Sequence, residues 1–248
     1  MYSSIMMVLI LILPIPVLVR ELKRGTSPYR AIVQGTLAAG VGIAFIFALA
    51  QIAGDGLSAE VGRSVSEMAK AMAGSDQMAQ ALGMADAGRQ ERIAEYKKLY
   101  DQAAQMLPSV LLITAVVVSW IEGIIIGRSI RREGIPVNPV PPLRELSLPK
   151  SAIIGWLIIM VITWILSAVH FPGGSMLLSN ANILFEFTFA LQGMALIFVF
   201  AYKKRIPKAA AVIVVIILWL ISIGQMVMFF MGIIDVAFNL RNRIKNRG

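Results

Sequence analysis

Long, uninterrupted apolar segments constrain this chain more than any other feature of its sequence. Five of them have 19 to 26 residues, and an α-helix needs about 20 apolar residues to cross the hydrocarbon core of a bilayer. Because no water is available there to hydrogen bond with backbone amides, these segments are predicted to be α-helices. They are residues 31–53, 107–127, 151–170, 183–201 and 209–234.

A shorter apolar segment precedes them at residues 5–19. It contains Pro14 and Pro16, which interrupt helical hydrogen bonding, so it predicts a kinked or partial span. It has neither a basic region before it nor a small-residue cleavage site, so we do not expect a removable signal peptide. With this segment, the chain is predicted to be an all-α, polytopic transmembrane helical bundle of about six spans.

The composition excludes the common alternatives. Hydrophobic residues make up 58% of the chain and charged residues 15%, whereas a soluble domain has about 45–50% and about 25%. A soluble globular domain and a disordered chain are both inconsistent with these values. We therefore expect the lipid bilayer itself to be the principal partner.

The basic residues predict how the spans are oriented. Clusters in residues 20–30, 128–150 and 202–208 fall on one side of an alternating six-span arrangement, and the positive-inside rule makes that side cytoplasmic. Such clusters also attract anionic lipids, which are expected partners at these loops. Because the net charge of +9 is concentrated beside apolar spans, we do not expect nucleic acid to be a partner.

The basic tail at residues 235–248 conflicts with this alternation, which places it outside the cell. The tail contains Arg241, Arg243, Lys245 and Arg247. Two alternatives stay open: the segment 209–234 turns back at Gly224, or another segment is re-entrant.

Two segments between the spans have distinct character. Residues 54–106 contain apolar residues at helical spacing, which predicts amphipathic helices on the outer side of the membrane. Residues 128–150 are rich in proline and predict a stiff cytoplasmic linker. The organisation is therefore two N-terminal membrane segments (1–53), the amphipathic segment (54–106), a third span (107–127), the linker (128–150), three C-terminal spans (151–234) and the basic tail (235–248).

The sequence contains no residues for the familiar catalytic chemistries. It has no cysteine and one histidine, His170, so thiolate and histidine-rich metal sites are excluded within one chain. It has no phosphate-binding loop, zinc-protease, serine-hydrolase or dinucleotide motif. We therefore expect no enzyme activity, no metal and no cofactor.

Polar residues inside the apolar segments or directly before them are the candidate binding residues, because polar groups are costly in lipid. The candidates for a small ligand are Glu186, Asn182, Gln192 and Gln225. Asn182 and Glu186 are four positions apart and share a helix face. The alternative for all of them is hydrogen bonding between helices.

Two other charged groups have structural interpretations. Glu122 in the third span is expected to reach toward Arg128 at the basic end of that span. Asp235 ends the last apolar segment and is followed by Arg241, which indicates an ion pair or an interfacial anchor.

Four stretches carry a family resemblance: Leu13-Pro14-Ile15-Pro16, Leu148-Pro149, Asn182-Ile183-Leu184 running into Leu191-Gln192-Gly193-Met194-Ala195, and Gly232-Ile233-Ile234-Asp235 with Phe238 and Arg241. With these the chain resembles the YybS-like family of predicted bacterial membrane proteins. That family is distantly similar to the substrate-binding components of energy-coupling-factor transporters, and its members carry further hydrophobic helices ahead of the Leu-Pro-x-Pro stretch. No catalytic residues can be carried over from that family, because none are established for it.

Two functions are consistent with these features. The first is a small-solute binding or transport component in the bacterial cytoplasmic membrane, with a cavity that opens toward residues 171–182. The alternative is a non-enzymatic membrane scaffold or assembly partner in the cell envelope, which would associate with other membrane proteins. A cavity would favour the first function, and co-purifying partners would favour the second.

Overall fold

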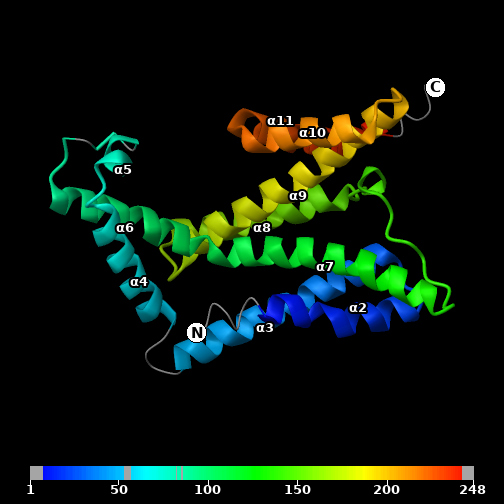
Figure 1. Cartoon of the computed structure of the whole chain (residues 1–248), viewed down its shortest axis with the longest axis horizontal. Helices are drawn as coiled ribbons and strands as arrows, with labels where there is room; N and C mark the ends of the chain where they lie inside the picture. The colour runs from blue at the N-terminus through cyan, green and yellow to red at the C-terminus, as the bar shows by residue number, and fades with distance from the viewer. Residues whose placement is uncertain (1–7, 53–56, 82, 85, 242–248) are drawn as a thin grey trace. The chain divides into compact units, whose positions relative to one another are not determined.

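A computed structural model describes residues 8–241 except 53–56, 82 and 85. In these residues every regular element is helical (Figure 1). The chain forms two compact units, Met1–Pro139 and Val140–Gly248. The all-α prediction is therefore confirmed for the part of the chain that the structure describes.

Three helices of the first unit pack together: α2 (Pro14–Lys23), α3 (Pro28–Ile52) and α7 (Leu107–Arg132). Helical structure before α2 is interrupted at Leu13, where the prolines of the first apolar segment predict a kink. The buried face of α7 consists largely of small residues, which allow close helix packing. They are Ser109, Ala115, Ser119, Gly123 and Gly127.

The segment predicted to be amphipathic forms α4 (Leu57–Met72), the short α5 (Asp76–Ala81) and α6 (Arg89–Gln105). The apolar faces of α4 and α6 pack against each other. Tyr96 of α6 is buried with Ala69 of α4 and with Ala73, which directly follows that helix. The helices predicted from the apolar spacing are therefore present, and they bury much of their apolar surface against one another.

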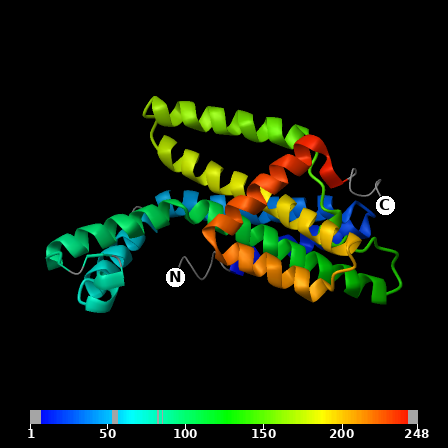
Figure 2. The same ribbon diagram turned by 90° about the horizontal axis from the view of Figure 1, so that it is seen from above.

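The second unit is built around one long helix, α9 (Gly174–Lys203). It contacts α8 (Ser151–Ala168), the 3-10 helix η1 (Leu143–Glu145), α10 (Lys208–Leu220) and most extensively α11 (Ser222–Phe238). Figure 2 shows α11 crossing α9.

Glycines permit this crossing. A Cβ atom on Gly232 would lie 1.8 Å from the carbonyl oxygen of Phe189, and a Cβ on Gly193 would lie 1.9 Å from that of Met228. The backbones of α9 and α11 therefore approach as closely as only glycine allows.

Three helices in the described residues are long and apolar enough to cross a membrane, namely α7, α8 and α9. The pair α10 and α11 makes a fourth candidate if both helices belong to one span. The sequence predicts about six spans, and that number is not confirmed. The segment 31–53 corresponds to α3, which has 25 residues, and its assignment as a span stays a prediction.

The last apolar segment, 209–234, is not the continuous helix that its length predicts. It is bent by 113° between α10 and α11, at Ile221, whose backbone is extended. The bend lies three residues before Gly224, the position where the sequence suggested a turn. Gly224 still contributes, because a Cβ there would lie 2.2 Å from the carbonyl oxygen of Leu218.

Candidate functional site

A buried cluster of polar side chains joins α9 to α11 in the second unit. We call Gln192, Asp235 and Arg241 the Gln192 cluster; these three residues are 1%, 3% and 4% exposed. The Nε2 of Gln192 donates to Oδ2 of Asp235 at 2.6 Å. Its Oε1 accepts a hydrogen bond of 3.1 Å from the backbone N–H of Leu148, in the segment before α8. Gln192 thus links three parts of the unit.

The way α11 ends brings Arg241 back to Asp235. The helix stops at Phe238, and Asn239 adopts a left-handed conformation with φ of 52°. Asparagine tolerates this conformation better than most residues. The turned chain places the Arg241 backbone N–H 2.9 Å from Oδ1 of Asp235.

The same pair of residues also forms an ion pair. Nη2 of Arg241 lies 3.6 Å from Oδ2 of Asp235, and both side chains are almost fully buried. The ion pair expected from the sequence is confirmed, and it lies in the interior of the unit. A buried pair of this kind is expensive to desolvate, so its presence needs a structural or functional reason.

Hydrogen-bonding capacity remains on Arg241. Within the residues that the structure describes, its Nε and Nη2 are buried and have no hydrogen-bond partner. These two nitrogens form one edge of the guanidinium, which can bind a carboxylate or phosphate in bidentate fashion. Nη2 is also the atom that makes the 3.6 Å ion-pair contact with Oδ2 of Asp235, so this edge of the guanidinium faces a carboxylate although it makes no hydrogen bond.

The four ligand-binding residues predicted from the sequence do not converge on one place. Asn182 and Glu186 lie on an exposed face of α9, where Nδ2 of Asn182 donates to Oε1 of Glu186 at 2.9 Å. Gln225 is exposed at the α10–α11 bend and donates to the carbonyl oxygen of Trp219 at 2.6 Å. Of the four, only Gln192 contacts buried charged residues.

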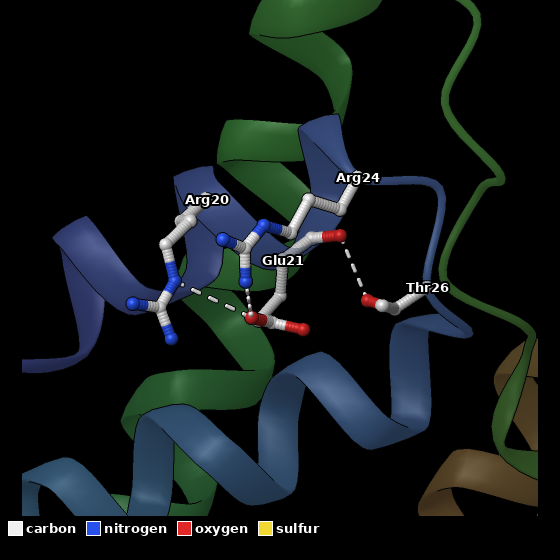
Figure 3. Close-up of polar contacts among 4 residues, drawn as sticks. All are labelled: Arg20, Glu21, Arg24 and Thr26. Carbon is white, nitrogen blue, oxygen red and sulfur yellow. Dashed lines mark hydrogen bonds and ion pairs between the residues drawn. The ribbon is translucent and has the colours of Figure 1, made fainter.

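The first unit contains a buried carboxylate that is not among the residues predicted from the sequence. Glu21 of α2 is 5% exposed, although it belongs to a basic cluster. Figure 3 shows its carboxylate beside Arg20 and Arg24, each with a nitrogen 3.4 Å from Oε1. The hydroxyl of Thr26 donates to the Glu21 backbone oxygen at 2.7 Å.

The neighbouring helix α3 also contacts this carboxylate. With its amide nitrogen turned toward Glu21, Gln34 donates to both carboxylate oxygens at 3.2 Å. One signal in the sequence could have found this residue: Glu21 lies between Leu18 and Leu22, both of which are buried on the same face of α2. This arrangement ties the basic end of α2 to α3.

Glu122 of α7 differs from its expected arrangement. Its Oε2 is buried and has no hydrogen-bond partner among the described residues. The region described by the structure also contains no group of three or more histidine, aspartate or glutamate side chains that could hold a metal ion.

Comparison with known proteins gives the same family as the resemblance seen in the sequence. A family model described as "Predicted membrane protein (DUF2232)" matches residues 1–236. The "Uncharacterized protein YybS" of Bacillus subtilis (strain 168) is 31% identical over 143 residues. That match covers 56% of this chain and 45% of the relative, so the aligned region spans about half of each. No solved structure matches the chain.

Proposed function

Because the chain belongs to the DUF2232 family of predicted membrane proteins, we propose that it binds a small anionic solute as a component of a transport system. In this proposal it is a multi-pass protein of a bacterial cytoplasmic membrane. The observation that carries the proposal is the buried guanidinium edge of Arg241, held beside Asp235 and Gln192. The proposal takes Gln192 from the residues predicted by sequence and adds the two charged residues.

The electrostatics of the cluster support this function. Ionisable residues within membrane helices are costly and commonly mark solute or ion pathways. Asp235 accepts hydrogen bonds from Gln192 and the Arg241 backbone, which fixes the carboxylate in place. The fixed carboxylate lies 3.6 Å from Nη2 of Arg241, so a solute with one acidic group would share or replace this contact at a preorganised guanidinium.

Ligand-induced stabilisation of the detergent-purified protein tests the proposal. Small carboxylates and phosphate esters would be screened for a saturable rise in unfolding temperature. We expect at least one compound to stabilise the native chain, and expect Arg241→Lys to lose that response because lysine lacks the bidentate edge. Lys204→Gln, which removes an exposed positive charge elsewhere in the unit, should retain it. A panel without any saturable response, or an equal response from Arg241→Lys, would contradict the proposal.

A scaffold or assembly role is the second candidate, and one observation favours it. Asn182 and Glu186 form a hydrogen-bonded polar pair on an exposed face of α9, a helix long and apolar enough to span a membrane. Polar residues on such faces hold neighbouring helices together. If this function is correct, replacing both residues with leucine should remove co-purifying membrane proteins, whereas the exposed Leu177→Ala should not. Unchanged co-purification would exclude this role for the pair.

A further inference from the structure

A cavity of about 300 Å³ lies where η1, the last turn of α9 and the first turn of α10 meet. It is at the basic end of α9, whereas the sequence suggested an opening toward residues 171–182, which precede and begin that helix. Its walls are largely apolar, and two cations, Arg144 and Lys208, also line it. The apolar walls include Phe198, Ala201, Ala211 and Val212.

The Arg144 side chain is positioned by its neighbours. Its Cζ lies 4.1 Å from the centroid of the Tyr202 ring, in a cation–π contact. Its Nε is 3.9 Å from Oε1 of Glu145. That separation is longer than a hydrogen bond, so N–H donors remain available to an anion. These contacts therefore fix the position of the Arg144 cation at the edge of an apolar cavity.

Helix α10, whose first turn lines the cavity, also has a positive charge next to an apolar surface. Lys208, Val212 and Ile216 are spaced four residues apart and lie on one face of α10. Val212 is 43% exposed and Ile216 is 52% exposed. An elongated molecule could therefore place an acidic group at Lys208 and an apolar chain along the other two residues.

The position of the cavity along the membrane normal follows from α9. This helix is a candidate span that ends at Lys203, and Lys204 and Arg205 follow it directly. Basic residues at the end of a span lie at the level of lipid headgroups.

We propose that this cavity binds the headgroup phosphate of an anionic phospholipid. Arg144 and Lys208 contact the headgroup, and an acyl chain follows Val212 and Ile216. The site is independent of the Gln192 cluster and of the proposed solute. Basic loops attract anionic lipids in general, and this proposal assigns one such lipid to a specific site.

The test measures lipid binding to the full chain in detergent micelles by native mass spectrometry, with phosphatidylglycerol and phosphatidylcholine as probes. We expect the native protein to retain phosphatidylglycerol in preference. The double variant Arg144→Gln/Lys208→Gln should lose roughly 10- to 30-fold of that affinity. The double variant Lys150→Gln/Lys204→Gln removes the same charge from residues that do not line the cavity, and it should change binding less than about twofold.

A second variant tests the apolar part of the cavity without changing its charge. Val212→Trp fills the apolar part while both cations remain, and it should also weaken binding of phosphatidylglycerol. Circular dichroism would confirm that each variant is folded. Equal loss in the two double variants would overturn the proposal, as would equal binding of the two lipids. Competition by glycerol 3-phosphate at the concentration of the lipid would show that the phosphate ester alone is the ligand, and this would also overturn it.

Discussion

The side-chain amide of Gln192 donates a hydrogen bond of 2.6 Å to the Asp235 carboxylate, and this contact joins two helices across 43 positions of sequence. Its amide oxygen also accepts from the backbone of Leu148, so both ends of the amide are used. One uncharged side chain therefore connects the segment before α8, the middle of α9 and the end of α11.

Replacing Gln192 with leucine should destabilise the second unit. The change leaves the Leu148 N–H without its acceptor and removes one donor from a buried carboxylate. An unsatisfied buried polar group costs about 1–3 kcal/mol, and we expect a loss of stability in this range in detergent unfolding. Gln102→Leu, at an exposed position of α6, should change stability by no more than about 0.5 kcal/mol. Equal effects of the two changes would contradict the importance of the buried amide.

Replacing Gly232 with alanine should force α11 away from α9. The added methyl group would lie 1.8 Å from the Phe189 carbonyl oxygen, a distance that cannot be accommodated without a backbone shift. Overpacking of this kind costs about 1–3 kcal/mol, measured as a lower unfolding temperature.

Gly155 provides the matched control for this substitution. It lies in α8, and a Cβ there meets nothing within 4 Å. Gly155→Ala should be neutral or stabilising by up to about 1 kcal/mol, because alanine favours a helix. If both alanine variants behave alike, the close crossing does not limit stability.

Single-cysteine labelling should place the basic tail on the same side of the membrane as the turn between α9 and α10. A re-entrant pair, with α11 turning back at the 113° bend, would remove the conflict between the tail and the positive-inside rule. A cysteine appended after Gly248 and the variant Lys204→Cys should react with an impermeant maleimide from one side. Ser175→Cys should react from the other.

The native chain suits this experiment because it has no cysteine to react in the background. Labelling of the appended cysteine from the same side as Ser175→Cys would contradict the turn and support a continuous crossing.

Replacing Glu21 with leucine should weaken the packing of α2 against α3. The substitution removes the acceptor that faces Gln34 and leaves Arg20 and Arg24 without their ion-pair partner. Because both arginines are largely exposed, most of the effect should come from the buried side, about 1–2 kcal/mol in thermal or denaturant unfolding. Glu133→Gln alters an exposed carboxylate and should have little effect. A neutral Glu21→Leu variant would show that the carboxylate is not needed for folding.

The sequence predicts the helices well because hydrophobicity and length suffice to recognise a membrane helix. The segments at 107–127, 151–170 and 183–201 correspond to α7, α8 and α9. The bend at Ile221 could not be predicted in the same way. Residues 209–234 contain neither proline nor a charge, and although Gly224 suggested a turn, nothing in the sequence indicates a break at Ile221. Contacts of α11 with α9, which lie far apart in the sequence, accompany the bend.

The candidate site was predicted only in part, for a related reason. Spacing within one helix identifies the Asn182–Glu186 pair, and proximity in sequence suggests the Asp235–Arg241 pair. Neither helical spacing nor proximity in sequence predicts the contact between Gln192 and Asp235. That contact depends on the crossing of two helices at Gly193 and Gly232. The basic neighbours of Glu21 indicate an exposed, orienting cluster, and they therefore hide the fact that its own face of α2 is buried.

The shortness of α10 and α11 has a consequence for biogenesis. With 13 and 17 residues, both helices are shorter than the roughly 20 residues of a typical straight span. We therefore expect insertion of the C-terminal region to depend on α9, against which α11 packs at Gly232. A nascent chain interrupted before residue 232 would lack that docking point and become a target for membrane quality control.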